Sequence, residues 1–325
     1  MALRKYIAQR LVFLAASFLI ILLLNFAIPR LMPGNPIDRF INPIMTPKDQ
    51  QQILQSFGLT QPIYVQFWLY LKGLLTGNYG VSFLYYPVPV VTILEQRIPW
   101  TLLLVGTATV LSTLIGMVLG MRAASKAGGK EDTFYVLSSM AWRSVPSFWL
   151  SLFLLITFGV TFRIFPTSGY FSTQLLLNGG STWAYIQSVF MHSFLPVVAL
   201  MAYLVGGNLL IMRASALNTL KEDFVLTMKA IGYPESRVVY NHVMKNAFLP
   251  MLTNIGIQLG FIASGAVLVE TVFSYPGMGL LIYQATLARD YPTLQGAFFV
   301  LSVTVLLAVF ATDILYSLLD PRIRR

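Results

Sequence analysis

The sequence contains no cysteine, only two histidines and few charged residues. Without cysteine, the chain can form no disulfide and no thiolate metal site, and thiol catalysis is excluded. His192 and His242 lie far apart in the sequence, so a dedicated metal site is not expected. Charged residues make up 10% of the 325 residues, whereas soluble domains carry about 25%. The low charge excludes an ordinary soluble domain and a disordered chain.

Catalytic motifs are also absent from the sequence. There is no His-Glu-x-x-His segment, no Gly-x-Ser-x-Gly segment and no phosphate-binding Gly-x-x-x-x-Gly-Lys segment. The two acids beside the last apolar runs, Glu270 and Asp313, lie near run ends, where hydration or a polar neighbour explains them as well as a function does. We therefore expect no catalytic residue, no bound cofactor and no metal ligand in this chain.

Long apolar runs dominate what is present. Apolar residues make up 56% of the chain and the mean hydropathy is +0.71, and a membrane-spanning helix needs about 20 apolar residues. Six runs are expected to span a membrane: 11–29, 98–121, 144–162, 191–213, 246–269 and 291–312. The third run extends back toward Phe134 and contains Arg143, and a Gly- and Pro-rich loop precedes the fourth. The sequence thus predicts an all-α membrane protein with six transmembrane helices.

The basic residues indicate the topology. The net charge is +10, but the basic residues flank the apolar runs, so we expect no nucleic-acid partner. With six spans, 14 basic residues lie on one side and seven on the other, four of these in the long 31–97 segment. Because basic residues concentrate on the cytoplasmic side, both termini are expected there. A signal peptide is the alternative for the first run, but its apolar core is long and no cleavage site follows it.

Residues 31–97 form an extracytoplasmic segment in this topology. Thr46 to Asp49 have the pattern of a helix start, and that helix would end at Gly58. A second amphipathic helix is expected from Pro62 to Leu75, ending at Gly77, with aromatic residues along one side. The segment is either a cap on the membrane surface or a docking platform for an outside partner, and the two roles are compatible.

The cytoplasmic segment 214–249, between the fourth and fifth runs, has a distinct pattern. A short helix is expected over Asp223–Ile231, with Gly232 as its left-handed stop. Pro234 begins a second helix with Glu235 in its first turn. Such a protrusion can sit in a groove of a cytoplasmic partner and move as a rigid body. An ordinary helical loop that binds nothing is the alternative.

Ala230, Gly232, Arg237 and the run His242–Pro250 resemble the EAA loop of binding-protein-dependent ABC importer permeases, in particular the dipeptide/oligopeptide subfamily. Further segments resemble motifs of that subfamily in the same order along nearly the whole chain: Leu31–Pro36, Phe57–Pro62, Gly77–Phe83, Pro146–Trp149, Phe165–Gly169, Glu270–Gly279 and Asp320–Arg324. Two positions depart from the pattern. Leu226 stands at the place of the loop's glutamate, and Asn35 replaces a usual aspartate.

The resemblance implies a single permease domain over residues 1–325, in the plasma (inner) membrane of a prokaryote. Such permeases pair with a second, homologous permease, and two cytoplasmic ATPases bind ATP and Mg on their own chains. A separate extracytoplasmic binding protein delivers the substrate. The resemblance places ATPase coupling on the segment's tip, at Ala230, Gly232, Tyr233, Pro234, Glu235 and Arg237. Peptides are the first expected substrate, with oligosaccharides, nickel or glutathione as alternatives.

Small and polar residues within the apolar runs are candidates for lining the transport path. We expect this role for Arg143, Ser144, Asn208, Asn254 and Gln258. The alternative is that the small and polar residues serve helix packing, and that Arg143 extends to the membrane surface. A stand-alone channel or secondary transporter is the alternative of another class, but it would need more charges within the membrane, and no inverted repeat is evident.

Overall fold

Long apolar stretches fold into helices because a membrane leaves every backbone polar group to be satisfied within the segment. The computed structural model describes residues 2–32, 48, 54–55, 58–177, 179–260 and 262–319. Its helices, in which η1 and η2 are π-helices, are α1 (Ala2–Leu31), α3 (Ile63–Thr76), α4 (Val90–Ser125), α5 (Lys130–Ser144), α6 (Ser147–Leu154), η1 (Leu155–Thr161), α7 (Gln174–Leu177), α8 (Thr182–Thr219), α9 (Asp223–Ala230), α10 (Glu235–Arg237), η2 (Val238–Val243), α11 (Met244–Ala247), α12 (Leu249–Gly260), α13 (Ile262–Val272), α14 (Met278–Leu287) and α15 (Tyr291–Leu319). Within the described residues, β structure is limited to one isolated bridge between Val81 and Pro89.

Four of these helices are long and apolar enough to cross a membrane: α1 from Arg10 onward, α4, α8, and α15 as far as Thr312. A fifth candidate combines α5 with α6 and η1, which are bent against each other by 88°. The prediction of an all-helical membrane fold is therefore confirmed. The count of six spans stays a prediction.

The third predicted span is not one continuous helix. Val145 and Pro146 separate α5 from α6, with extended backbone at both residues (ψ 121° and 137°). Proline disfavours helical geometry in the residue before it, and this explains the break. Arg143 therefore lies in the last turn of α5 rather than within a straight span.

Two other spans differ from the expected boundaries. The predicted span 246–269 corresponds to α12 and α13, two shorter helices on either side of residue 261. The fourth span is longer than expected, because α8 already starts at Thr182, where the Ser181 hydroxyl accepts a hydrogen bond from the Ala184 amide at 3.3 Å. Before it, the described residues of 162–181 are irregular apart from α7, as the glycine and proline pattern predicted.

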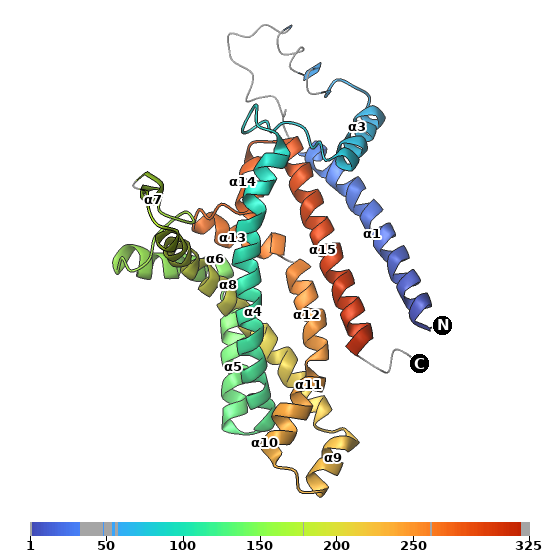
Figure 1. Cartoon of the computed structure of the whole chain (residues 1–325), viewed down its shortest axis with the longest axis vertical. Coiled ribbons are helices and arrows are strands. Elements are labelled where there is room, and N and C mark those ends of the chain that lie inside the picture. The colour runs from blue at the N-terminus through green and yellow to red at the C-terminus, as the bar shows by residue number, and fades with distance from the viewer. Residues whose placement is uncertain are drawn as a thin grey trace.

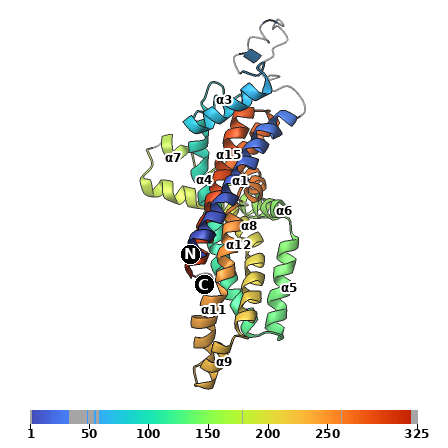
Figure 2. The same cartoon turned by 90° about the vertical axis from the view of Figure 1, so that its right-hand side faces the viewer.

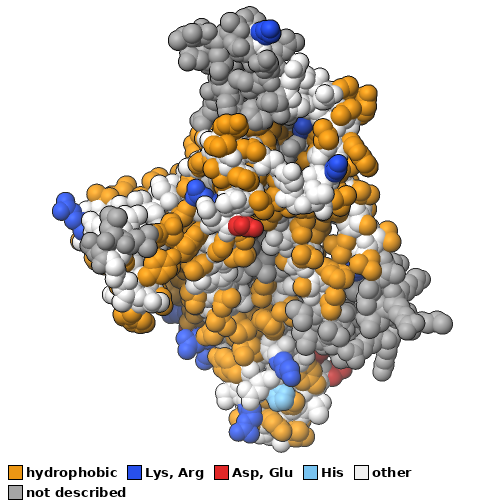
Figure 3. Space-filling view, turned by 45° about the horizontal axis from the view of Figure 1, so that its top comes forward, with side chains coloured by type: hydrophobic (Ala, Val, Ile, Leu, Met, Phe, Trp, Pro, Cys, Tyr) orange, Lys and Arg blue, Asp and Glu red, His pale blue; other side chains and the backbone are white. Residues whose placement is uncertain are grey.

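The helices form an elongated bundle (Figure 1). α4 packs along α8, and α15 lies between α1 and α12. α9 and α10 protrude at one end of the bundle, whereas α3 lies at the other (Figure 1, Figure 2). Hydrophobic side chains cover most of the described surface seen in Figure 3. On α1, for example, Val12 and Phe13 are 69% and 70% exposed, as expected of a helix that faces lipid.

The buried apolar residues form three clusters, and α4 contributes to all of them. One cluster joins α4 to α6, α8 and α13, and a second joins α4 to α14 and α15. The third joins α4 and α8 to α9, η2, α11 and α12. Gly120 allows the close approach of α4 and α8, since a Cβ atom there would lie 2.6 Å from the Leu209 carbonyl oxygen.

The segment after α1 is described in part. The helix expected from Thr46 is described only at residues 48 and 54–55, which are helical, and Gly58, its predicted end, is left-handed (φ 68°). The departure at Asn35 lies outside the described residues. The second helix is confirmed as α3, and Gly77 ends it in a left-handed conformation (φ 71°). α3 packs on α1, where the Arg30 guanidinium stacks 3.7 Å above the Phe26 ring and donates to the Gln66 side-chain oxygen at 3.0 Å.

Candidate functional site

The segment between α8 and α12 has the predicted helix–glycine–proline–helix geometry. α9 covers Asp223–Ala230, and Gly232 follows with a left-handed φ of 84°. An L side chain rarely adopts this conformation, whereas glycine does so freely. Pro234 then precedes α10, with φ fixed at −57°. Local sequence signals thus determine the sharp turn at the tip of the segment.

The base of this segment is buried. Val225 on α9 and Val238, Val239 and Val243 on η2 are at most 4% exposed. They pack in one cluster with Met121 of α4, Met212 and Ala216 of α8, and Met251 of α12. Because well-packed side chains transmit displacement rather than deform, the base joins α9 and η2 firmly to α4, α8 and α12.

The tip of the segment is exposed and partly apolar. All six residues predicted for coupling, Ala230, Gly232, Tyr233, Pro234, Glu235 and Arg237, are exposed there. Ile231 and Leu226 add apolar surface, with 67% and 62% of each residue exposed. Lys229 and Glu235 form an exposed ion pair at 3.3 Å. A cluster of exposed apolar side chains on a rigid base is typical of a protein-binding surface. Leu226, which stands at the glutamate position of the EAA loop, enlarges this apolar surface.

Three of the predicted path residues meet in one hydrogen-bonded cluster. The buried Asn208 side-chain oxygen, on α8, accepts from the Asn254 amide at 2.7 Å and from the Gln258 amide at 2.6 Å, both on α12. The Asn208 amide in turn donates to the Ser112 hydroxyl on α4 at 3.1 Å. Asn254 and Gln258 are themselves only half-buried. The cluster therefore links three helices, and the Gln258 side-chain oxygen is buried beside it without a hydrogen-bond partner among the described residues.

Arg143 and Ser144 do not take part in this cluster. Arg143 is exposed at the end of α5 and lies against Gly206 of α8, where a Cβ atom would come within 2.9 Å of the arginine Cγ. The Ser144 hydroxyl donates to the Met140 carbonyl within its own helix at 2.9 Å. Within the described part of the chain, no hydrogen bond joins either side chain to Asn208, Asn254 or Gln258.

Asn208→Ala is expected to weaken the packing of α12 on α8 and α4. It removes three hydrogen bonds, and since such bonds in membranes contribute about 0.6 kcal/mol each, the free energy of unfolding should fall by about 2 kcal/mol. A thermal melt of the purified protein in mild detergent measures this loss. Asn246→Ala is the matched control, because Asn246 is exposed and makes one hydrogen bond, to the His242 carbonyl. Equal melting temperatures for the two variants would contradict the linking role.

Glu270 is a buried carboxylate, and the structure shows which groups hydrogen-bond to it. It is fully buried, and it accepts hydrogen bonds from the Thr101 hydroxyl on α4 at 2.7 Å and from the Leu280 amide at 2.9 Å. The Thr101 hydroxyl oxygen also accepts from the Met278 amide at 2.7 Å. The motif Glu270–Gly279 therefore folds around its own acid and is fastened to α4. A polar neighbour, one of the two predicted explanations for Glu270, is confirmed. The side chain of Asp313 lies outside the described residues.

Asp290 makes a second buried anchor, which sequence reasoning missed. Its carboxylate accepts from the Ser82 hydroxyl, from the Leu84 amide at 3.0 Å and from the Thr293 hydroxyl at 2.8 Å. It thereby fixes the segment before α4 to the turn between α14 and α15. Asp290 lies between two apolar runs, next to Arg289 and Tyr291. An acidic residue in such a position is normally interpreted as a hydrated loop residue, and this is why the sequence did not indicate the anchor.

Comparison with known proteins shows the family. Residues 116–325 match the family described as the binding-protein-dependent transport system inner membrane component, and residues 3–105 match the N-terminal region of such membrane components. The chain belongs to the binding-protein-dependent transport system inner membrane components. The family resemblance predicted from the motifs is confirmed. The chain is accordingly a transport component and a multi-pass protein of the inner membrane.

Individual members of the family are similar to this chain over nearly its full length. The dipeptide transport system permease protein DppB of Lactococcus lactis is 32% identical over 321 residues, which is 98% of this chain and 99% of that protein. The oligopeptide transport system permease protein AppB of Bacillus subtilis is 30% identical, with 98% of both chains covered. DppB of Escherichia coli K12 is 31% identical, again with 98% of both chains covered. The similarity therefore includes both the segment around α9 and the region around α3.

Proposed function

We propose that this chain is the permease subunit of an ATP-driven importer and forms half of the path for dipeptides or oligopeptides. The near-full-length similarity to three peptide permeases carries this proposal. The exposed tip around Gly232, mounted on a buried base, supports it because an importer needs a rigid contact between the membrane and its energy source. ATP and Mg bind on partner subunits in this scheme, and the chain itself holds no cofactor.

The tip is the coupling surface for a cytoplasmic ATPase. Leu226, Ile231 and Tyr233 supply apolar contact area, and Glu235 and Arg237 supply charges that orient the partner. Closing of two ATPases moves the tip, and the buried base passes the movement to α4, α8 and α12. A second, homologous permease carries the other tip, so that both halves move together between inward- and outward-facing states.

The proposed topology has six passes with both termini in the cytoplasm. α12 and α13 together make the fifth pass, and α5 with α6 and η1 makes the third. The tip lies at the same end of the bundle as the turn between α4 and α5 (Figure 1), and this turn carries the basic residues Lys126 and Lys130. Basic residues on one side support a cytoplasmic location for both. The segment 31–97 then faces outward and receives the binding protein.

The polar cluster is the proposed wall of the path. Asn254 and Gln258 are half-buried amides on α12, the helix that continues from the coupling segment through α11. Amides can donate to and accept from the main chain of a passing peptide without binding it as tightly as a charge would. Arg143 and Ser144 remain predictions of the sequence, and among the described residues neither side chain is hydrogen-bonded to this cluster.

Affinity purification from native membranes in mild detergent tests the proposal. Partners would be identified by mass spectrometry. We expect a second six-span permease and P-loop ATPases to be recovered with the tagged chain, and the binding protein of the same system can then be screened with dipeptides, oligopeptides and oligosaccharides. Recovery of the chain alone, as an oligomer that moves solute in vesicles without ATP, would overturn the assignment. Preference of the binding protein for oligosaccharides would overturn the substrate class.

A further inference from the structure

An apolar groove lies between α1, α3 and α15, beside the surface that faces lipid. Its volume is about 390 Å³, and its walls include Phe18 and Leu22 of α1, Leu71 and Leu75 of α3, and Phe299 of α15. The Phe18 and Phe299 rings contact each other across it at 6.0 Å between centroids. Next to it on α1, Leu19 and Leu23 are 61% and 57% exposed. The groove is therefore continuous with the exposed hydrophobic surface of α1, which we expect to face lipid.

α3 has the chemistry of a helix that lies in a membrane interface. Trp68 and Tyr64 are exposed on it, and Leu75 at its C-terminal end is almost fully exposed. Aromatic residues favour the interface between lipid and water. The only charged residue of α3 is Lys72, and neither α1 nor α3 contains an acidic residue. Within the part of the chain that the structure describes, no acidic side chain pairs with Lys72.

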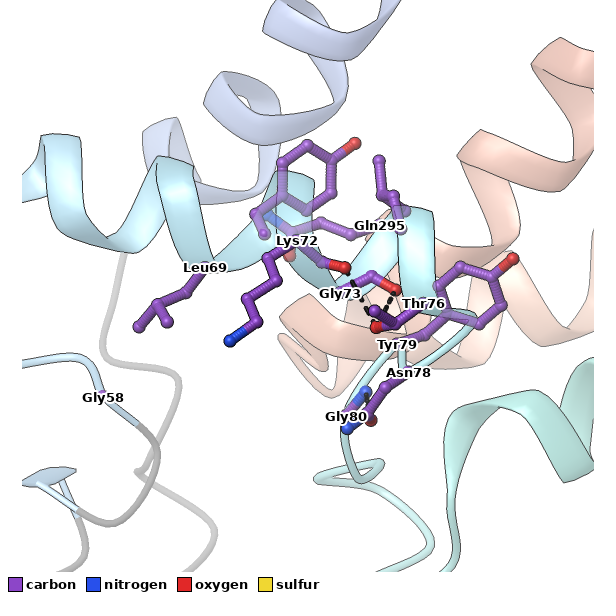
Figure 4. Close-up of a pocket in the computed structure, with 11 residues that line it drawn as sticks. Gly58, Leu69, Lys72, Gly73, Thr76, Asn78, Tyr79, Gly80 and Gln295 are labelled. Carbon is purple, nitrogen blue, oxygen red and sulfur yellow. Dashed lines mark hydrogen bonds between the residues drawn. The ribbon is translucent and has the colours of Figure 1, made fainter.

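A second, more polar hollow of about 520 Å³ adjoins the groove, and the two share Lys72, Leu74 and Thr76 as lining residues. The Lys72 side chain extends away from α3 into the space bordered by Gly58 (Figure 4). Asn78 and Gln295 also line the hollow, and the Gln295 nitrogen beside it is a buried donor without a partner among the described residues.

Among the residues that the structure describes, those lining the hollow offer a positive charge and polar groups, and none of them is an aspartate or a glutamate. Burial raises the pKa of Tyr70 to about 12, so this phenol stays neutral and adds no negative charge. An ammonium group with neighbouring amides is a suitable site for a phosphate group.

We propose that the groove and the adjoining hollow bind one anionic phospholipid, with an acyl chain between α1, α3 and α15 and its phosphate group against Lys72. The charge of the site selects the occupant: a zwitterionic lipid would place a cationic group near the lysine, whereas an anionic headgroup adds only attraction. The position of the groove beside the exposed side of α1 gives a bilayer lipid direct access. The bound lipid would hold α3 against the bundle at the end opposite the coupling tip, and the site exists whatever solute the chain transports.

Fluorescence quenching locates the lipid. The purified full chain would be titrated in mild detergent with phosphatidylglycerol carrying dibrominated acyl chains, and with the matching phosphatidylcholine. Subtracting the signal of Trp68→Phe isolates the contribution of Trp68, which lines the groove. We expect phosphatidylglycerol to quench Trp68 at a concentration about fivefold lower than phosphatidylcholine, since one lysine near a lipid surface contributes about that factor.

Two charge variants complete the experiment. Lys72→Glu should abolish the preference for phosphatidylglycerol, whereas Lys221→Glu, at an exposed lysine between α8 and α9, should retain it. Native mass spectrometry of the same samples should show one fewer retained phosphatidylglycerol per chain in Lys72→Glu. Equal quenching by both lipids, or an unchanged preference in Lys72→Glu, would overturn the proposal. Shielding of Trp68 by the binding protein, without any lipid preference, would also overturn it and assign the groove to protein docking.

Discussion

Gly232→Asp is expected to reduce transport to about a tenth or less while leaving membrane insertion and the amount of protein unchanged. Gly232 has a φ of 84°, and no atom lies within 4 Å of the position that a Cβ would occupy. The substitution therefore causes no clash within the chain. Its cost in the folded state is about 1–2 kcal/mol of backbone strain, but it places a charge and a bulky group on the surface that we assign to the ATPase. The rate of ATP hydrolysis and the rate of uptake, measured in the same vesicles, should become uncoupled.

Gly169→Asp is the matched control for this variant. Gly169 lies in the loop before α7, has a φ of 81° and is also surrounded by open space. The same substitution thus introduces similar strain and charge away from the tip, and transport should be retained. Lys229→Ala at the tip should also have little effect, because exposed ion pairs contribute less than about 1 kcal/mol. Normal transport by Gly232→Asp would show that the tip is not the coupling surface.

Glu270→Ala is expected to give the largest loss of stability among the described polar anchors. The variant leaves the Thr101 hydroxyl and the Leu280 amide without their acceptor, in a site where Glu270 is fully buried. Each buried donor left unpaired costs about 1–3 kcal/mol. The melting temperature in detergent should fall by at least about 5 °C. Glu95→Ala, at an exposed acid on the same helix as Thr101, should melt like the unmodified protein.

Gly277→Ala tests whether the segment Glu270–Gly279 packs closely around the Glu270 carboxylate. A Cβ atom at Gly277 would lie 2.3 Å from one Glu270 carboxylate oxygen, so the single variant should destabilise the protein by about 1–3 kcal/mol. The backbone at Gly277 is extended and allows alanine. In the Glu270→Ala background the methyl group has room, and its additional cost should disappear. Additive losses in the double variant would contradict the packing of this motif around its acid.

Local signals made much of the fold predictable. The positions of glycine and proline predicted the end of α3 at Gly77 and the turn between α9 and α10 at Gly232 and Pro234. The positions of the apolar runs followed from composition alone. Hydropathy averages over a whole window, however, and so it overlooked the break that Pro146 imposes between α5 and α6.

The anchors within the bundle were not predictable, because their partners are remote in the sequence. Glu270 bonds to Thr101, 169 residues away, and Asp290 bonds to Ser82, 208 residues away. A single sequence contains no signal for such pairs. Asn208, Asn254 and Gln258 were singled out from the sequence as candidates for lining the path, and that role stays a prediction. Their hydrogen bonding to one another and to Ser112 required the structure.

ATP-dependent uptake decides whether the chain works as proposed. The complex would be purified through a tag on this chain and reconstituted in proteoliposomes with its binding protein and a labelled dipeptide or oligopeptide. We predict accumulation that requires ATP with Mg on the cytoplasmic side together with the binding protein, and that is lost in Gly232→Asp but not in Gly169→Asp. Peptide movement of equal rate with and without ATP would contradict the assignment of the chain as a subunit of an ATP-driven importer.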